Sequence, residues 1–435
     1  MAIKLSISGI RGKFHELSPS RVVEFAQAYS NYIGGGDILI SSDSRPSGKF
    51  IREALIAGLT AAGSNVIDYG NLPTPILQWL IKNASCSGGV SITAGHNTFD
   101  WNCLIFLNAE GSYINHIEGE EFFNVYHSGR FITRKYDRIG TYSQQESPPE
   151  SYFNALSINE KSDKFPKFVV DCSNGFTEDI IEKLSLALHV KMIPIFSSKT
   201  NIMEKDPEPT ILNAQLLGTI VRETGSDGGF LLNSDASRVL VVDEYGQPHS
   251  EELTLPIFAS IILEKEKSHI VTNYSTSNTI DQVAKKFNSR VFRTDVGQPQ
   301  VVQSVQDLKT TIGGEGSGSI IYSPFSSGFD SFYFIRTIIQ YLHQNKVSLS
   351  YIASQFVPPR IYKETLFLPQ TKIYKILERI GNLYTPTVRL KDGFYIRNGE
   401  DWLCIRASAT VSMIRIVGEG ESISDEIARI KELVI

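Results

Sequence analysis

Apolar and polar residues alternate in two distinct patterns along the first 140 residues. From Ser18 the chain reads SPSRVVEFA, in which a capping serine precedes apolar positions at helical spacing. Residues 37–42 form an apolar run typical of a buried strand, residues 50–62 return to helical periodicity, and residues 65–69 predict the next strand. This alternation predicts βαβ units on a largely parallel sheet.

The pattern starts again twice and then changes. Residues 143–151 are polar and rich in proline, and we interpret them as a linker. Further α/β units begin with the apolar runs at 168–175 and 269–273, whereas the last segment mixes strands with a terminal helix. We therefore predict three mixed α/β domains followed by a smaller α+β domain. Their expected bounds are 1–142, 152–255, 256–358 and 362–435.

Composition narrows the class of protein. A chain of 435 residues is too long to fold around one hydrophobic core, so we expect several domains. A content of 41% hydrophobic and 20% charged residues is typical of a soluble globular protein. The net charge of -5 gives no reason to expect nucleic acid as a partner. The first residues are too polar for a signal peptide and no apolar run is long enough to span a bilayer, so we expect a cytoplasmic protein without a membrane partner. Four cysteines without zinc-ligand or C-x-x-C spacing predict reduced thiols in the core, at Cys86, Cys103, Cys172 and Cys404.

Several segments of the first domain place polar side chains after apolar runs. Arg11 lies between two glycines, where a guanidinium can reach a phosphate with several donors, although such loops are commonly structural turns. Residues 93–98 read TAGHNT and bring hydroxyls, the imidazole of His96 and an amide to one turn. We interpret residues 43–48 (DSRPSG) and 72–75 (LPTP) as turn and helix-start chemistry.

The segment 233–238 reads NSDASR and precedes an apolar strand. One carboxylate, Asp235, lies between the neutral Asn233 and Ser237. Magnesium prefers anionic oxygen ligands in octahedral geometry, and one carboxylate with neutral oxygens is a poor site for it. A polar turn is therefore the preferred interpretation.

Two later loops carry groups suited to a phosphorylated sugar. In the glycine-rich run GGEGSGS, Glu315 and Ser317 can bond neighbouring sugar hydroxyls, although a plain turn explains the run equally well. After a predicted strand at 402–405, a guanidinium and two hydroxyls suit a phosphate dianion, at Arg406, Ser408 and Thr410.

In order and spacing, these segments resemble the motifs of the α-D-phosphohexomutases. The family's usual strings are GTSGIRG, TASHNP, DGDADR, GGE-x-SG and R-x-SGTEP, and they match residues 6–12, 93–98, 233–238, 313–318 and 406–412. The resemblance spans nearly the whole chain. It implies an α/β fold of four domains around a central cleft, with three mixed α/β domains and a smaller α+β domain.

The departures from the family pattern occur at the positions that the family uses for catalysis and metal binding. In the family, a serine at the position of Gly95 carries the phosphate, and a lysine at the position of Ile105 assists proton transfer. Three aspartates, at positions 233, 235 and 237, hold Mg²⁺ in the family, whereas this chain has Asn233, Asp235 and Ser237. Glycine cannot be phosphorylated and isoleucine cannot move a proton. The resemblance therefore leaves no intact catalytic or metal set, and we expect no cofactor.

The positions that the resemblance assigns to ligand binding are retained: Glu315, Ser317, Arg406, Ser408 and Thr410, with Arg11 and His96 beside the degenerate loop. The resulting prediction is a phosphoglucomutase/phosphomannomutase-like protein that has lost mutase catalysis. Such a protein would bind a hexose phosphate or serve as a regulatory or structural partner of an active paralogue, as a homodimer or heteromer. The alternative is an active isomerase that moves phosphate between the 1- and 6-positions of a hexose with a substitute phosphoryl carrier.

Overall fold

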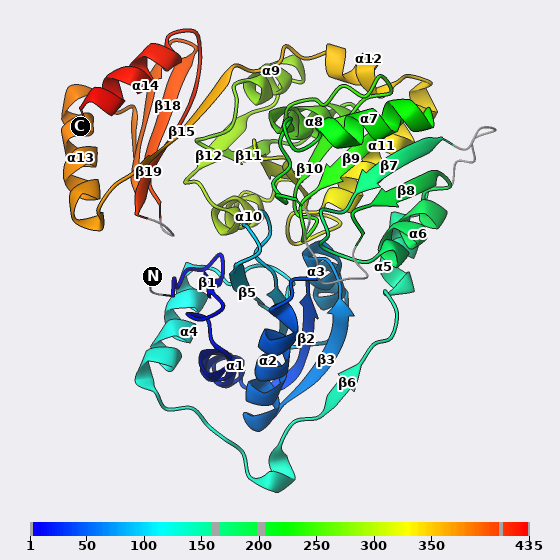
Figure 1. Cartoon of the computed structure of the whole chain (residues 1–435), viewed down its shortest axis with the longest axis vertical. Coiled ribbons are helices and arrows are strands. Elements are labelled where there is room, and N and C mark those ends of the chain that lie inside the picture. The colour runs from blue at the N-terminus through cyan, green and yellow to red at the C-terminus, as the bar shows by residue number, and fades with distance from the viewer. Residues whose placement is uncertain (1–2, 159–165, 198–204, 409–411, 434–435) are drawn as a thin grey trace.

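The computed structural model describes residues 3–158, 166–197, 205–408 and 412–433 (Figure 1). Four β-sheets follow one another along the chain, and helices cover each of them. The first unit, blue to cyan in Figure 1, lies below the second and third units, and the fourth, orange to red, stands at their side. No helix of the described residues is long and apolar enough to cross a membrane.

The first unit contains a six-stranded sheet in the order β1-β5-β4-β2-β3-β6. Its strands are β1 (Ile10–Lys13), β2 (Gly36–Ser42), β3 (Ser64–Asn71), β4 (Gly88–Ile92), β5 (Trp101–Leu107) and β6 (Tyr142–Gln144). The central pairs are parallel, whereas β5 runs antiparallel to both β4 and β1. The sheet is therefore more mixed than the alternating pattern predicts, because β1 and β5 join it without a crossover helix.

The segment interpreted as a linker is partly ordered secondary structure. Strand β6 pairs in parallel with β3, and the hydroxyl of Tyr142 donates to a carboxylate oxygen of Asp68 at 3.1 Å. Helix α5 (Glu150–Leu156) begins inside the same segment. All three residues of β6 are exposed, so no apolar alternation marks this edge strand in the sequence.

Helices on both faces bury the first sheet. On one face, α1 (Pro19–Ile33), α2 (Gly48–Ala61) and α4 (His116–Ser128) enclose an aromatic core in which the rings of Phe106 and Phe122 lie 4.8 Å apart. On the other face, α3 (Thr74–Asn83) buries Ile76, Leu77 and Ile81. That helix belongs to a hydrophobic cluster that continues into the second and third units, so the three share one core.

The second and third units each hold a four-stranded sheet, in the orders β10-β9-β7-β8 and β12-β11-β13-β14. The second contains β7 (Lys167–Asp171), α6 (Glu178–Ala187), β8 (Lys191–Ile195), α7 (Gln215–Thr224), β9 (Gly228–Leu232) and β10 (Val239–Val242). The third contains α8 (Thr254–Leu263), β11 (Ile270–Asn273), α9 (Thr279–Lys286), β12 (Val291–Thr294), α10 (Gln298–Asp307), β13 (Ile312–Glu315), β14 (Ser319–Tyr322), α11 (Ser331–Asn345) and α12 (Leu349–Ser354). Helix α8 is apolar on nearly every side and is buried between neighbours, as such a helix must be.

The fourth unit is an antiparallel sheet in the order β15-β19-β18-β17-β16, with two helices. Its elements are β15 (Ile361–Phe367), α13 (Gln370–Leu383), β16 (Val388–Leu390), β17 (Gly393–Asn398), β18 (Asp401–Ala407), β19 (Met413–Glu419) and α14 (Ile423–Glu432). The carboxylate of Glu419 accepts bonds from Ser277 Oγ and the Asn278 backbone N–H, which ties this unit to the third. Three mixed α/β units followed by a smaller unlike unit confirm the predicted fold class.

Candidate functional site

Two loops from different units meet at the position of the missing serine. The first follows β4 and contains Gly95; the second follows β9 and contains Ser234 and Asp235. The hydroxyl of Ser234 donates to the carbonyl oxygen of Gly95 at 2.6 Å. A side chain on Gly175 would lie 2.0 Å from the carbonyl oxygen of Ser234, so only glycine permits this close approach. The structure thus brings together the two degenerate motifs that the sequence separates by more than a hundred residues.

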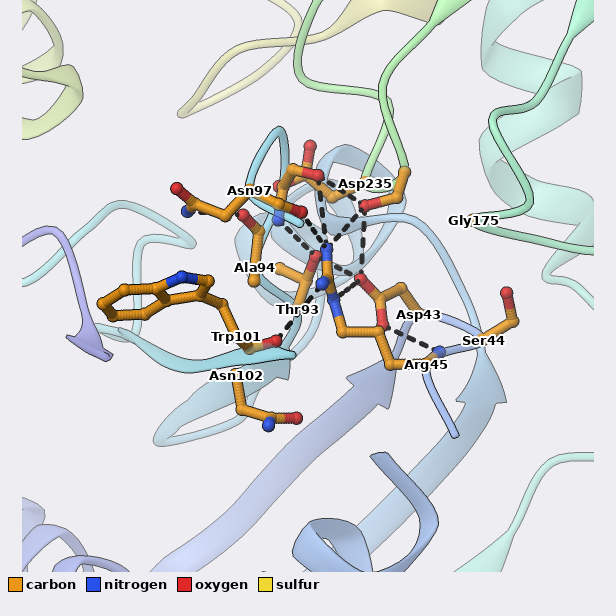
Figure 2. Close-up of polar contacts among 12 residues, drawn as sticks. Asp43, Ser44, Arg45, Thr93, Ala94, Asn97, Trp101, Asn102, Gly175 and Asp235 are labelled. Atoms are coloured by element: carbon orange, nitrogen blue, oxygen red, sulfur yellow. Dashed lines mark hydrogen bonds and ion pairs between the residues drawn. The ribbon is translucent and has the colours of Figure 1, made fainter. Parts of the chain in front are cut away.

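Arg45 fixes the shape of the Gly95 loop (Figure 2). Its guanidinium is paired with the carboxylate of Asp43 at 2.9 Å, and both side chains are almost fully buried. The remaining nitrogens donate to main-chain carbonyls of the loop, at 2.9 Å to Thr98, 3.2 Å to Asn97 and 3.2 Å to Trp101. Interpreting residues 43–48 as local turn chemistry misses this role, because a bond to a carbonyl leaves no mark on the partner's residue type.

Gly95 has a positive φ of 57°, a backbone conformation that favours glycine. A Cβ built at this position would lie 3.1 Å from Oδ2 of Asp235 and 3.6 Å from Nδ2 of Asn233. The space that a serine side chain would occupy therefore faces residues 233–238, which we call the degenerate metal loop.

The metal loop is closed on itself by hydrogen bonds. Oδ1 of Asp235 accepts from Asn233 Nδ2 at 2.8 Å, from Ser237 Oγ at 2.6 Å and from the Ser237 backbone N–H at 3.1 Å. The amide and the hydroxyl thus turn their hydrogens, not their lone pairs, toward the one carboxylate. In the described part of the chain, no three His, Cys, Asp or Glu side chains gather as a metal-binding group. These residues do not fit Mg²⁺, and weak magnesium binding stays a prediction for measurement.

The other degenerate position is part of the core. Ile105 lies in β5, opposite Ser91 of β4, and is only 4% exposed. Its side chain supports the sheet below the loop and offers no proton-transfer group there.

His96 lies in a crowded, positively charged environment. Burial lowers its pKa well below 6.5, and the charges of Arg238, Arg11 and Arg415 lower it further, with a smaller effect from Arg45. The imidazole is therefore neutral at physiological pH. These charges come from three different units of the chain, so His96 marks the point at which the units converge.

We call Arg11, Arg238 and Arg415 the arginine cluster. Arg11 donates to the hydroxyl and the carbonyl of Ser8, at 2.9 and 3.0 Å. Arg238 reaches Glu208 at 3.5 Å, while its buried Nε has no hydrogen-bond partner in the described structure. The side chain of Arg415 forms no hydrogen bond or ion pair with another described residue. Its pKa is lowered by desolvation and by Arg406, Arg238 and Arg11, against an opposing effect of Glu208. Neither Arg238 nor Arg415 stood out in the sequence as a site residue.

The residues predicted to bind sugar hydroxyls lie at the end of β13: Glu315 is its last residue, and Ser317 follows it. Glu315 is buried and accepts from Asn273 Nδ2 at 2.8 Å, while the hydroxyl of Ser317 lies 3.5 Å from its other oxygen. Gly316 packs directly against the carboxylate of Glu252, whose pKa burial raises to about 8. Glu315 is thus held by a neighbouring side chain, whereas Ser317 is partly exposed.

We call the predicted phosphate-binding residues the phosphate clamp: Arg406, Ser408 and Thr410. Its arginine already bonds other parts of the protein. Nε and Nη2 of Arg406 bond the two carboxylate oxygens of Asp392 at 2.8 and 2.6 Å, and Nη2 also reaches the carbonyl of Val296. Ser408 is partly exposed, and Thr410 lies outside the described residues. Arg406 and Arg415 are direct partners across β18 and β19, so the clamp and the arginine cluster adjoin.

Comparison with known proteins agrees with this geometry. Models of the phosphoglucomutase/phosphomannomutase alpha/beta/alpha domains I, II and III match residues 3–130, 150–246 and 251–359. A probable phosphoglucosamine mutase of Thermococcus kodakarensis is 30% identical over 420 residues, which cover 95% of this chain and 93% of that protein. A phosphoglucomutase/phosphomannomutase of the same organism is 27% identical over 431 residues, with 95% and 94% covered.

A solved structure shows the same fold. The phosphoglucomutase/phosphomannomutase family protein of Burkholderia thailandensis superimposes with a TM-score of 0.82 at 21% identity, over 98% of this chain and 94% of its own. The resemblance read from the motifs is confirmed by both kinds of comparison. The chain therefore belongs to the phosphoglucomutase/phosphomannomutase family of the α-D-phosphohexomutases.

Proposed function

We propose that this protein acts on hexose phosphates and transfers their phosphoryl group at a centre that uses neither a seryl phosphate nor Mg²⁺. The observation that carries the proposal is the arginine cluster around His96. A buried Arg238 Nε without an acceptor is costly, and the pKa of Arg415 is lowered first by desolvation and then by the charges of neighbouring arginines. A phosphate dianion would supply the missing acceptor and offset the charge.

The similar proteins support the interpretation that this protein is an active enzyme over the interpretation that it has lost catalysis. Proteins named as mutases align with this chain over more than nine-tenths of both lengths. Their names favour the alternative of an active mutase over the prediction that mutase activity has been lost, and the substitute phosphoryl carrier is part of our proposal.

A second candidate function is a non-catalytic cytoplasmic protein that binds a phosphosugar or serves as a regulatory or structural partner of an active paralogue. The residues at the degenerate positions favour it: Gly95 cannot carry phosphate, Ile105 cannot move a proton, and one carboxylate oxygen of Asp235 is taken up by hydrogen bonds from its own loop. Each missing group ordinarily contributes orders of magnitude to the rate.

One set of measurements separates the two candidates. The purified protein is assayed for interconversion of the 1- and 6-phosphates of glucose, mannose and glucosamine, with a catalytic hexose bisphosphate, in Mg²⁺ and in chelator. Calorimetry with the same sugar phosphates and with an unphosphorylated hexose measures binding. Turnover that survives the chelator supports the first candidate. Binding without turnover supports the second, and co-purification with a family member that retains the serine tests its partner role. If neither binding nor turnover occurs at millimolar substrate, the first candidate is wrong and only the partner role of the second remains, which the co-purification then decides.

A further inference from the structure

The two carboxylate oxygens of Asp235 differ in their hydrogen bonding. Oδ1 accepts all three hydrogen bonds from Asn233 and Ser237, whereas no hydrogen bond from a described residue reaches Oδ2. The residue as a whole is only 6% exposed. The three bonds fix the orientation of the carboxylate, and Oδ2 keeps its lone pairs free.

Oδ2 faces the space that Gly95 leaves open. It lies 3.1 Å from the point where a Cβ of residue 95 would be, the shortest contact that such an atom would make. A free carboxylate oxygen is therefore adjacent to the place where the family's serine side chain would lie.

Charged side chains act on two residues near this place, Cys103 and His96. Burial raises the pKa of Cys103, and the charges of Arg11 and Asp235 act on it in opposite directions, which places both charges near the same buried thiol. Arg11, Arg238 and Arg415 also act on His96, the neighbour of Gly95. Cations arranged in advance around a transferring phosphoryl group stabilise the charge that it carries.

We propose that Asp235 is the phosphoryl carrier of this protein and forms an aspartyl phosphate, an inference that rests on the phosphoryl transfer proposed above. A lone pair of Oδ2 forms a bond to the phosphorus of a hexose bisphosphate, and the bond from that phosphorus to the sugar oxygen breaks. The sugar oxygen keeps the electron pair and takes up one proton from the solvent, which gives a hexose monophosphate. In the return step the free hydroxyl of the isomeric hexose monophosphate loses a proton to the solvent and takes the phosphoryl group from Asp235, which regenerates the hexose bisphosphate and the free carboxylate.

Neighbouring hydroxyls are less suited to the task. Thr93 donates to Asp43 at 2.7 Å, Ser234 donates to the carbonyl of Gly95, and Ser237 donates to Asp235 itself. Each already uses its proton in a hydrogen bond to a neighbouring residue, and the bond of Ser234 also joins the two loops. His96 is the remaining rival nucleophile, and the stability of the phosphorylated product distinguishes an imidazole from a carboxylate.

The test is to incubate the protein with ³²P-labelled hexose 1,6-bisphosphate and to measure the label retained on the protein. We expect a label that hydroxylamine and alkali both remove, as for an acyl phosphate, and that borohydride trapping with mass spectrometry locates at Asp235. Asp235→Asn should reduce the label at least tenfold, whereas the matched variant at an exposed site, Asp307→Asn, should retain it. A label that survives alkali, a label that survives both acid and hydroxylamine, or a full label in Asp235→Asn would each overturn the proposal.

Restoring the family's serine provides a second test. In Gly95→Ser the new Cβ crowds Oδ2 of Asp235, so we expect the label to fall several-fold and not to move. Transfer of the label to the new serine would overturn the assignment. Trapping on the unaltered protein remains decisive even if a variant misfolds.

Mutase turnover tests the proposed function, and labelling of the protein tests the aspartyl carrier. Mutase turnover without any protein label would overturn the aspartyl carrier and leave the proposed function standing. Absence of both turnover and label would overturn both.

Discussion

Arg415→Met is the substitution that most directly tests the arginine cluster. The side chain projects from β19 beside Arg406, and no described residue bonds or pairs with it. Because desolvation and three neighbouring arginines lower its pKa, the charged form is held there at a cost to the free protein. Methionine keeps much of the apolar stem and removes only the charge and the donors.

The expected effect on binding follows from one charge-assisted contact. A hydrogen bond from a charged group contributes about 1.5–3 kcal/mol, and each 1.4 kcal/mol is a tenfold change in Kd. Arg415→Met should therefore weaken hexose phosphate binding about 10- to 100-fold. The melting temperature should stay constant or rise, since the substitution relieves repulsion. Arg406 behaves differently: its removal leaves Asp392 without its bidentate partner, so Arg406→Ala should lower both affinity and stability.

The measurement is calorimetry with a hexose 6-phosphate at two salt concentrations, together with a thermal melt. Arg130→Met, at an exposed arginine, is the matched control and should bind as the unaltered protein does. If Arg415→Met changes the Kd by less than twofold, the cluster does not hold the phosphate. A large fall in melting temperature alongside the loss of binding would show instead that Arg415 is structural.

Three further outcomes are expected. Arg45→Met should lower the unfolding free energy in urea by about 3–5 kcal/mol, because it leaves Asp43 as a buried unpaired charge; a loss below 1 kcal/mol would contradict this. Burial raises the pKa of Asp330 to about 6 from 3.8, so the folded state holds the proton more tightly and stability should fall as pH rises from about 4 to about 6, by roughly 3 kcal/mol. Asp330→Asn should flatten the dependence on pH of the unfolding free energy measured in urea, over this pH range. An unchanged slope of free energy against pH would contradict the prediction. The melting temperature should not respond to millimolar Mg²⁺ beyond a general salt effect, and a saturable rise abolished by Asp235→Ala would refute this.

The sequence by itself determines most of the fold class and the family. Apolar periodicity predicts the strand at 37–42 and the helix at 50–62, and the structure places β2 at Gly36–Ser42 and α2 at Gly48–Ala61. Such patterns are local, because each residue's burial follows from its place in one element. The degenerate motifs are equally visible in the sequence, since the absence of a side-chain oxygen at Gly95 needs no structure to be recognised.

Tertiary structure alone decides how the site is built. The edge strand β6 has no apolar signal, because its residues are stabilised by backbone pairing with β3. Arg45 acts on main-chain carbonyls, which every residue carries, so no sequence pattern identifies its targets. Arg11, Arg238 and Arg415 lie on three units, and folding brings their charges to bear on one imidazole. Electrostatic energy depends on distance through space and on desolvation, neither of which is encoded by position along the chain.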